Sequence, residues 1–266
     1  MINFKRFVWN FKVLISAICK RTIILIKSPF VYKNFPLFIL SRFKNGTGIL
    51  KLRCGLNFKF RCKNDDRSTI SEIFILEIYN KYTINETDII VDAGANIGEF
   101  TLLAASQAKK GMVYAIEPNK EANELLLANI ASNNLTNVKT FDVALDSKDG
   151  IRNFYISHGT NSNFFYKTRD DKNILVKTIT LKHFIENNAI KKIDLLKMDI
   201  EGAEFDVLMN TSKEELRKIY KIILEFHNIS DGKNDKKLKY FLEKNGFQVE
   251  STSIVPWNGL LFARQQ

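Results

Sequence analysis

The sequence has few of the residues that mark non-globular proteins. Among 266 residues there are only 3 Cys, 4 Pro and 12 Gly, whereas 45% of the residues are hydrophobic and 12% are aromatic. This composition excludes a collagen-like or disordered chain, and three cysteines are too few for a disulfide-stapled scaffold. At this length we expect one large α/β domain, or one domain with a smaller attachment.

The three cysteines, Cys19, Cys54 and Cys62, have neither metal-ligand spacing nor a histidine cluster beside them. Their odd number also prevents complete pairing within the chain. We therefore predict reduced, structural thiols in a cytoplasmic protein.

Acidic residues are missing from the first 63 positions, which hold fourteen Lys and Arg. Residues 64–266 carry the other 26 basic residues and all 29 acidic ones, a balance of −3. The net charge of +11 therefore comes entirely from the N-terminal segment.

Long apolar runs are missing from this segment as well. Its longest uncharged stretches, Val13–Cys19 and Asn34–Ser41, are far shorter than the roughly 20 residues of a membrane-spanning helix. Lys20 and Arg21 close the first stretch, which argues against a secretory signal peptide. The residues allow two interpretations: a peripheral amphipathic segment on an anionic membrane surface, or a helical extension docked on its own domain.

The rest of the chain predicts an alternating α/β domain. Residues 45–63 have the alternation of a β-hairpin, and residues 68–82 have helical spacing with Ser68 as the N-cap. We place the basic extension at 1–63 and the main domain at 64–266. The expected strands are 89–92, 112–117, 138–145, 193–198, 222–226, 247–251 and 260–263, and the expected helices are 98–109, 120–133, 181–188, 203–218 and 235–245. This alternation predicts a mostly parallel sheet with ligands at the carboxyl ends of its strands.

The first of these strands runs into a glycine loop with the pattern D-x-G-x-x-x-G, from Asp92 through Gly94 to Gly98. A dinucleotide site has G-x-G-x-x-G instead. The carboxylate of Asp92 would repel a pyrophosphate but attract an ammonium or sulfonium group. The second strand ends in Glu117, at the distance along the chain where an acid binds a ribose diol.

Four segments in order, VDAGANIGEFTLLAA, AIEPN, LLKMDIEGAEFDVL and LEFH, resemble the FkbM-type family of S-adenosylmethionine-dependent methyltransferases. The similarity covers roughly residues 72–263. It implies a class I methyltransferase fold, a Rossmann-like, seven-stranded, mostly parallel sheet with helices on both faces and an antiparallel last strand. The resemblance also implies the cofactor contacts: Asp92, Gly94, Asn96 and Gly98 at the methionine end, Glu117 at the ribose, and Asp142, Val143 and Ala144 at the adenine. Ala144 stands where many methyltransferases have an acid, so its contact is expected through the backbone.

The fourth strand delivers three acids, Asp199, Glu201 and Glu204, at its end. Carboxylates there would be costly to bury without compensation, so a cationic cofactor beside them is a reasonable partner. In the resembled fold Asp199 lies nearest the transferred methyl, and we take Asp199 and Glu201 as catalytic candidates. Glu201 and Glu204 can alternatively stabilise a helix N-terminus.

The fifth strand places Glu225 and His227 on one side. His227 is the candidate general base, because an ordinary histidine titrates near neutral pH, although a structural role is also open. A divalent metal is an alternative means of activating the acceptor, with Asp199, Glu225 and Asn228 as candidate ligands. His183 is expected to be a surface residue with no catalytic role. His158 lies in a polar loop that could touch substrate, although an ordinary loop is the favoured interpretation.

The resemblance implies O-methylation, often of a sugar hydroxyl. The basic, apolar N-terminal segment favours an acceptor on a glycan or glycolipid, and the argument against a signal peptide favours a cytoplasmic enzyme that contacts the inner membrane face at most peripherally. Methylation of a base amino group is disfavoured, because the fourth strand ends in DIEG and not in an N/D-P-P-aromatic element. One alternative is a nicotinamide-dependent sugar dehydrogenase or epimerase, which the missing third glycine disfavours. Another is a nucleic-acid binder acting through residues 1–63, for which the main domain offers no second basic face.

Overall fold

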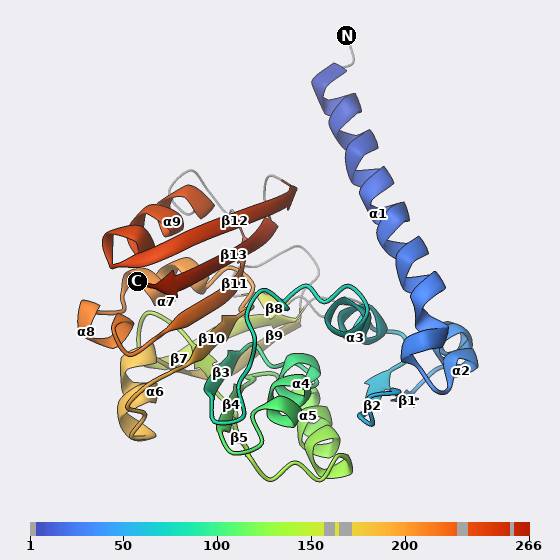
Figure 1. The fold of residues 1–266 in the computed structure, drawn as a ribbon, viewed down its shortest axis with the longest axis horizontal. Coiled ribbons are helices and arrows are strands. Elements are labelled where there is room, and N and C mark those ends of the chain that lie inside the picture. The colour runs from blue at the N-terminus through green and yellow to red at the C-terminus, as the bar shows by residue number, and fades with distance from the viewer. Residues whose placement is uncertain (1–3, 157–162, 165–171, 228–233, 256–257) are drawn as a thin grey trace. The chain divides into compact units, whose positions relative to one another are not determined.

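The computed structural model describes residues 4–156, 163–164, 172–227, 234–255 and 258–266 (Figure 1). The chain divides into two compact units, Met1–Ile78 and Tyr79–Gln266, so residue 63 lies inside the first unit. Among the described residues, no helix is both long enough and apolar enough to cross a membrane.

The first unit combines helices with a small hairpin. Its elements are α1 (Phe4–Val31), α2 (Phe35–Leu40), a 3-10 turn (Ser41–Phe43), β1 (Thr47–Lys51), β2 (Asn57–Arg61) and α3 (Asp66–Phe74). Strands β1 and β2 pair antiparallel, with Thr47 opposite Arg61, which confirms the predicted hairpin. The phenol of Tyr32, a fully buried residue, lies 2.9 Å from the hydroxyl of Ser71.

Helix α3 differs in both ends from the predicted helix over 68–82. It begins at Asp66, whose buried carboxylate accepts hydrogen bonds from the backbone and guanidinium of Arg61 at 2.7–3.0 Å. It ends at Phe74, and Glu77 just beyond has a φ of 53°. A residue in the left-handed conformation cannot continue a right-handed helix. The helix therefore ends before Glu77, although the apolar spacing in the sequence continues.

The second unit is built on a seven-stranded sheet. Its order is β12-β13-β11-β10-β3-β4-β5, and β13 runs antiparallel to both neighbours (Figure 1). The strands are β3 (Ile89–Ala93), β4 (Met112–Ile116), β5 (Val138–Phe141), β10 (Leu195–Met198), β11 (Lys221–His227), β12 (Phe247–Val255) and β13 (Asn258–Gln265). The predicted class I methyltransferase sheet with its antiparallel last strand is confirmed.

Helices cover both faces of this sheet. They are α4 (Glu99–Gln107), α5 (Lys120–Ser132), α6 (Leu181–Asn187), α7 (Glu204–Met209), α8 (Lys213–Leu216) and α9 (Asp235–Lys244). Ala115 of β4 packs with Leu126 of α5, whereas its neighbour Tyr114 packs in the cluster that holds Phe184 of α6 and Leu242 of α9. Adjacent strand residues point to opposite faces, so α5 and the α6–α9 group lie on opposite sides.

Two predicted elements are divided in the structure. The expected helix 203–218 is two helices, because Ser212 caps α8 by accepting a hydrogen bond from the Glu215 amide at 3.3 Å. The expected strand 138–145 contributes β5 to the main sheet and β6 (Ala144–Leu145) to a second sheet. That sheet, of order β6-β9-β7-β8, was not predicted and contains β7 (Gly150–Ile156), β8 (Asn163–Phe164) and β9 (Lys172–Ile179).

Candidate active site

The loop between β3 and α4 follows the strand as predicted, with left-handed φ values of 79° at Gly94, 47° at Asn96 and 99° at Gly98. A Cβ on Gly94 would lie 1.8 Å from the carbonyl oxygen of Asp199, and one on Gly98 would lie 2.8 Å from Leu126. Packing against the backbone of Asp199 and a positive φ therefore require glycine at position 94, and the positive φ favours glycine at position 98. The predicted contact of both glycines with the methionine end of the cofactor stays a prediction.

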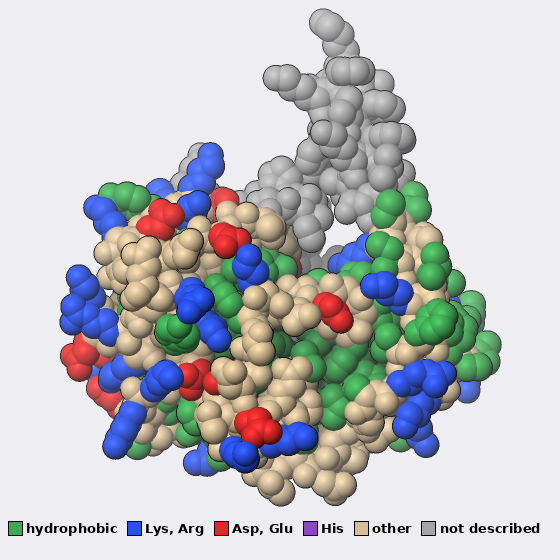
Figure 2. All heavy atoms as spheres, viewed as in Figure 1, with side chains coloured by type: hydrophobic (Ala, Val, Ile, Leu, Met, Phe, Trp, Pro, Cys, Tyr) green, Lys and Arg blue, Asp and Glu red, His purple; other side chains and the backbone are tan. Residues whose placement is uncertain are grey.

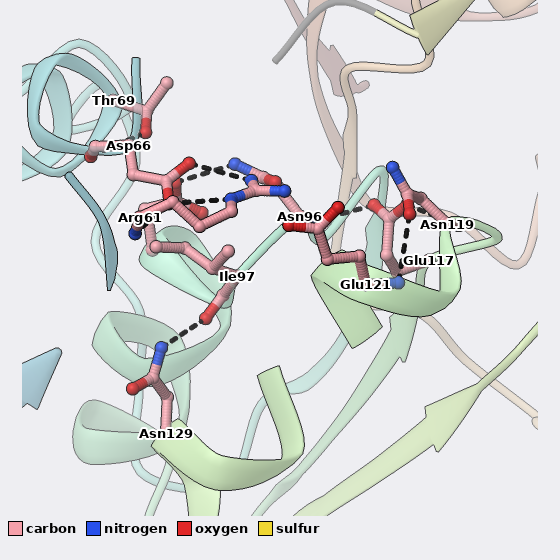
Figure 3. Close-up of polar contacts among 10 residues, drawn as sticks. Arg61, Asp66, Thr69, Asn96, Ile97, Glu117, Asn119, Glu121 and Asn129 are labelled. Carbon is pink, nitrogen blue, oxygen red and sulfur yellow. Dashed lines mark hydrogen bonds and ion pairs between the residues drawn. The ribbon is translucent and has the colours of Figure 1, made fainter. Parts of the chain in front are cut away.

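Glu117 follows the carboxyl end of β4 and is almost fully buried. Its two carboxylate oxygens accept hydrogen bonds from the backbone amides of Asn96 and Asn119, each at 2.8 Å (Figure 3). The side chain of Asn129 donates to the carbonyl of Ile97 at 2.8 Å and ties the same loop to α5. These contacts fix the position of a carboxylate, a group that accepts up to about four hydrogen bonds and matches a vicinal diol.

Asp92, predicted at the methionine end of the cofactor, lies inside the protein. Its side chain is fully buried, accepts a hydrogen bond from the Thr101 hydroxyl at 2.5 Å and lies 3.1 Å from the ammonium of Lys197. Lys197 also donates to the carbonyl of Gly94 at 2.8 Å. Asp92 is thus enclosed by protein atoms and does not line a surface, so we interpret its contribution as support of the loop through Lys197.

Lys197 was not singled out from the sequence, although it is the one charged residue in the buried strand LLKM. Burial lowers its pKa, but the charges of Asp92, Asp199 and Glu99 and the hydrogen bond to Asp92 outweigh burial, so the pKa of Lys197 is raised. The ammonium is therefore charged within the core.

The corner at residues 142–144 lies directly after β5, as expected for an adenine contact. Asp142 is exposed and Val143 is half-buried. The side chain of Ala144 is buried with Phe154 and Val176, which is compatible with the predicted backbone contact there. The role of this corner stays a prediction.

Strands β10 and β11 bring an acid–histidine cluster together at their carboxyl ends. His227 lies 3.2 Å from Glu201 through Nε2 and 3.3 Å from Glu204 through Nδ1. Glu204 also accepts hydrogen bonds from the amides of Ile200 at 3.1 Å and Gly202 at 2.9 Å, which is the helix N-terminal role left open for it. Glu201 has a φ of 52°, a conformation that costs a non-glycine residue about 1–2 kcal/mol. Such strain at a half-buried acid favours a functional role for Glu201.

The cluster changes the acid–base properties of its members. Burial lowers the pKa of His227, but its hydrogen bond to Glu204 and the charges of Glu204, Glu201 and Asp199 raise that pKa overall to about 10. Burial and the charge of Asp199 raise the pKa of Glu201 to about 8. A pKa of about 10 disfavours His227 in the role of proton acceptor that the sequence predicts for it. Glu201, with a pKa near working pH, is better suited to that role.

Tyr79, which the sequence did not mark, donates from its hydroxyl to Asp199 at 3.4 Å. Asp199, Glu201 and His227 each offer one ligand atom, and these atoms all lie within 4.8 Å of one another. Oxygen and imidazole donors so arranged could hold a divalent cation. The predicted set shares only Asp199 with them.

Of the other two candidate ligands, the structure describes only Glu225. Glu225 lies on the same side of β11 as His227, as expected, and accepts a hydrogen bond from Asn258 at 2.5 Å. Asn228 and the loop residue His158 lie outside the described residues. His183 is exposed and pairs with Asp149, consistent with a surface role.

This sheet order, the glycine loop and the strand-end acids define a class I methyltransferase. Residues 92–249 match the model of the methyltransferase FkbM domain, and the chain belongs to that family. It is an S-adenosylmethionine-dependent methyltransferase of FkbM type, which decides against the nicotinamide alternative.

Curated relatives carry related names. Methyltransferase 1 of Beauveria bassiana is 28% identical over 200 residues, 67% of this chain and 79% of the relative. The hexuronic acid methyltransferase AglP of Haloferax volcanii is 28% identical over 181 residues, 68% of this chain and 72% of the relative. The 2-O-methyltransferase NoeI of Sinorhizobium fredii is 26% identical over 155 residues, 52% of this chain and 63% of the relative.

A solved structure, methyltransferase FkbM from Methylobacillus flagellatus, aligns with a TM-score of 0.48 at 14% identity. The alignment covers 87% of this chain and 59% of that one.

Proposed function

We propose that this methyltransferase transfers the methyl group of S-adenosylmethionine to a hydroxyl of a sugar on a glycan or glycolipid. The observation that carries the proposal is the Glu201–His227 pair, a carboxylate of raised pKa beside a fixed imidazolium. O-methylation needs a proton acceptor at the reacting oxygen, and such a carboxylate supplies one. The names of two relatives, a hexuronic acid methyltransferase and a 2-O-methyltransferase, point to the same acceptor class.

The strand-end residues fit the cofactor in chemistry. Glu117, held by two backbone amides, would accept the two ribose hydroxyls. The loop of Gly94, Asn96 and Gly98 would hold the methionine end, and residues 142–144 the adenine. The bound cofactor supplies an electrophilic methyl on a positively charged sulfur, and Asp199 places negative charge at the neighbouring strand end.

The protein's main task is then to orient the acceptor and remove its proton. Displacement at a methyl group requires the attacking oxygen in line with the breaking bond, so positioning contributes much of the acceleration. The Glu201 carboxylate takes the hydroxyl proton as the oxygen–carbon bond forms. His227 orients Glu201, and Glu204 holds His227 through Nδ1.

As an alternative, Asp199, Glu201 and His227 would hold a divalent cation, with His227 in its neutral form, because an imidazolium has no nitrogen free to bind a metal. A bound cation would lower the pKa of a coordinated acceptor hydroxyl. This is an alternative to removal of the proton by a side chain alone.

The proposal is tested by incubating the purified protein with methyl-labelled S-adenosylmethionine and a panel of saccharides that includes hexuronic acids. We expect a methyl ether at one sugar hydroxyl, located by mass spectrometry and NMR, and its loss in Glu201→Gln. The matched control Glu214→Gln changes an exposed acid and should leave transfer intact. Label found on an amino group or in a carboxyl ester would overturn the proposal.

A further inference from the structure

The first unit exposes large apolar side chains on α1 and after α2. From residue 18 onward, where the side chains of α1 are described, Ile26 is 65% and Phe30 is 76% exposed. Phe43, after α2, is 80% exposed. Apolar side chains that gather on one surface, in contrast to scattered ones, mark an interaction site.

Helix α1 has two faces with apolar residues. One face packs within the first unit, and the other face is exposed. Ile24 and Ser28 are buried in their own unit. Ile23, Ile26 and Phe30 follow the i, i+3, i+7 spacing of a single helix face, and all three are exposed. Docking of α1 on its own unit, the alternative expected from the sequence, therefore leaves this face without a partner among the described residues.

Basic side chains accompany the apolar ones. Lys27, Lys33, Arg42 and Lys44 are exposed, and no acid occurs anywhere in residues 1–63. Figure 2 shows Lys and Arg interspersed with hydrophobic side chains over the lower part of α1 and over α2. We call the set Ile23, Ile26, Phe30 and Phe43 with Lys27, Lys33, Arg42 and Lys44 the basic apolar surface.

A partner for the basic apolar surface must be both negatively charged and able to bury hydrocarbon. A second copy of this chain would oppose like charges, whereas an anionic bilayer satisfies both demands. We propose that the basic apolar surface binds peripherally to anionic phospholipid membranes. The inference stands on the first unit alone and does not depend on the proposed acceptor.

The test is co-sedimentation of the full-length protein with vesicles of phosphatidylcholine alone and with phosphatidylglycerol added. We expect binding to the anionic vesicles that weakens with salt. Each change among Lys27→Gln, Lys33→Gln and Lys44→Gln should reduce partitioning about fivefold. Ile26→Asp with Phe30→Asp should abolish binding, because it replaces the inserted apolar groups.

Matched variants in the second unit separate this surface from general charge and hydrophobicity. Lys236→Gln with Lys237→Gln, and Leu175→Asp at a residue 72% exposed, should leave vesicle binding unchanged. Circular dichroism and retained S-adenosylmethionine binding show that each variant is folded. Equal binding by wild type and the surface variants, or binding to an RNA oligonucleotide without binding to anionic vesicles, would overturn the proposal.

Discussion

The ammonium group of Lys197 lies 3.1 Å from the carboxylate of Asp92 and 2.8 Å from the carbonyl oxygen of Gly94. The two side chains are 4% and 0% exposed, so this ion pair is inside the protein. Lys197→Met would leave the carboxylate of Asp92 without its charge partner, and we expect a loss of about 3–5 kcal/mol in the free energy of unfolding. Urea denaturation followed by circular dichroism measures it.

The double variant Asp92→Asn, Lys197→Met separates the pair from its parts. Removing both charges should cost less than Lys197→Met alone, because no unpaired charge remains. The exposed pair of Lys182 and Glu186, at 3.9 Å, is the control, and Lys182→Met should cost less than about 0.5 kcal/mol. If the double variant lost as much stability as Asp92→Asn and Lys197→Met lose together, the result would contradict a direct interaction between the two side chains.

Gly94→Ala tests the packing of the cofactor loop. Because its Cβ would lie 1.8 Å from the backbone oxygen of Asp199, we expect a loss above about 4 kcal/mol, measured by thermal or urea unfolding. Gly246 also has a positive φ, 89°, but a Cβ there meets nothing within 4 Å. Gly246→Ala should therefore cost only the strain of about 1–2 kcal/mol. Similar losses at both positions would show that the close approach is not rigid.

The cluster of His227, Glu201 and Glu204 makes the free energy of unfolding depend on pH in the alkaline range. The folded-state pKa of His227 is about 10, against an ordinary value of 6.5, so its stabilising contribution is complete below pH 6.5 and is lost as pH rises to 10. Because the pKa of Glu201 is raised from 4.5 to about 8, stability also falls as pH rises through this range, and that loss ends near pH 8. Between pH 8 and 10 the free energy of unfolding should fall in wild type and fall less in His227→Asn. The exposed His183→Asn should behave like wild type, and a flat wild-type curve would refute the assignment.

Methyl transfer should depend on ionisation of Glu201. A carboxylate accepts a proton only when it is ionised, so kcat/KM should rise with pH through about 8. Glu201→Gln should lower kcat by about 10²–10⁴-fold and remove that rise. The measurement is the pH profile of both proteins with a fixed acceptor. A rise through pH 8 that persists in Glu201→Gln would assign the base to another group.

Strand ends were predictable because buried strands are short apolar runs that stop at polar residues. Glu117 and Asp199 were each placed correctly after a strand for this reason, and His227, expected just after its strand, is the last residue of β11. The contacts among side chains were not predictable, because the reach of His227 to Glu201 and Glu204 depends on how two strands and a helix start lie beside each other. The same holds for Lys197, whose partners are distant in sequence.

The second sheet was missed for a different reason. In β7 and β9, Phe154 and Val176 face the interior while Ile151 and Leu175 are exposed, so both faces of these strands carry apolar residues. Alternation therefore gives no clear inner face. The break between α7 and α8 did have a signal, since Ser212 and Glu215 have the spacing of a capping box.

The central claim, that this strand-end site binds S-adenosylmethionine through Glu117, is tested most directly by calorimetric titration with S-adenosylmethionine and S-adenosylhomocysteine. Wild type should bind both, and Glu117→Gln should bind at least about tenfold more weakly, because charge-assisted hydrogen bonds to the ribose are lost. Glu124→Gln, at an exposed acid of helix α5, which follows Glu117 in the chain, should bind like wild type. Folded wild type that binds neither compound, with or without Mg²⁺, or Glu117→Gln that binds as tightly as wild type, would contradict the account.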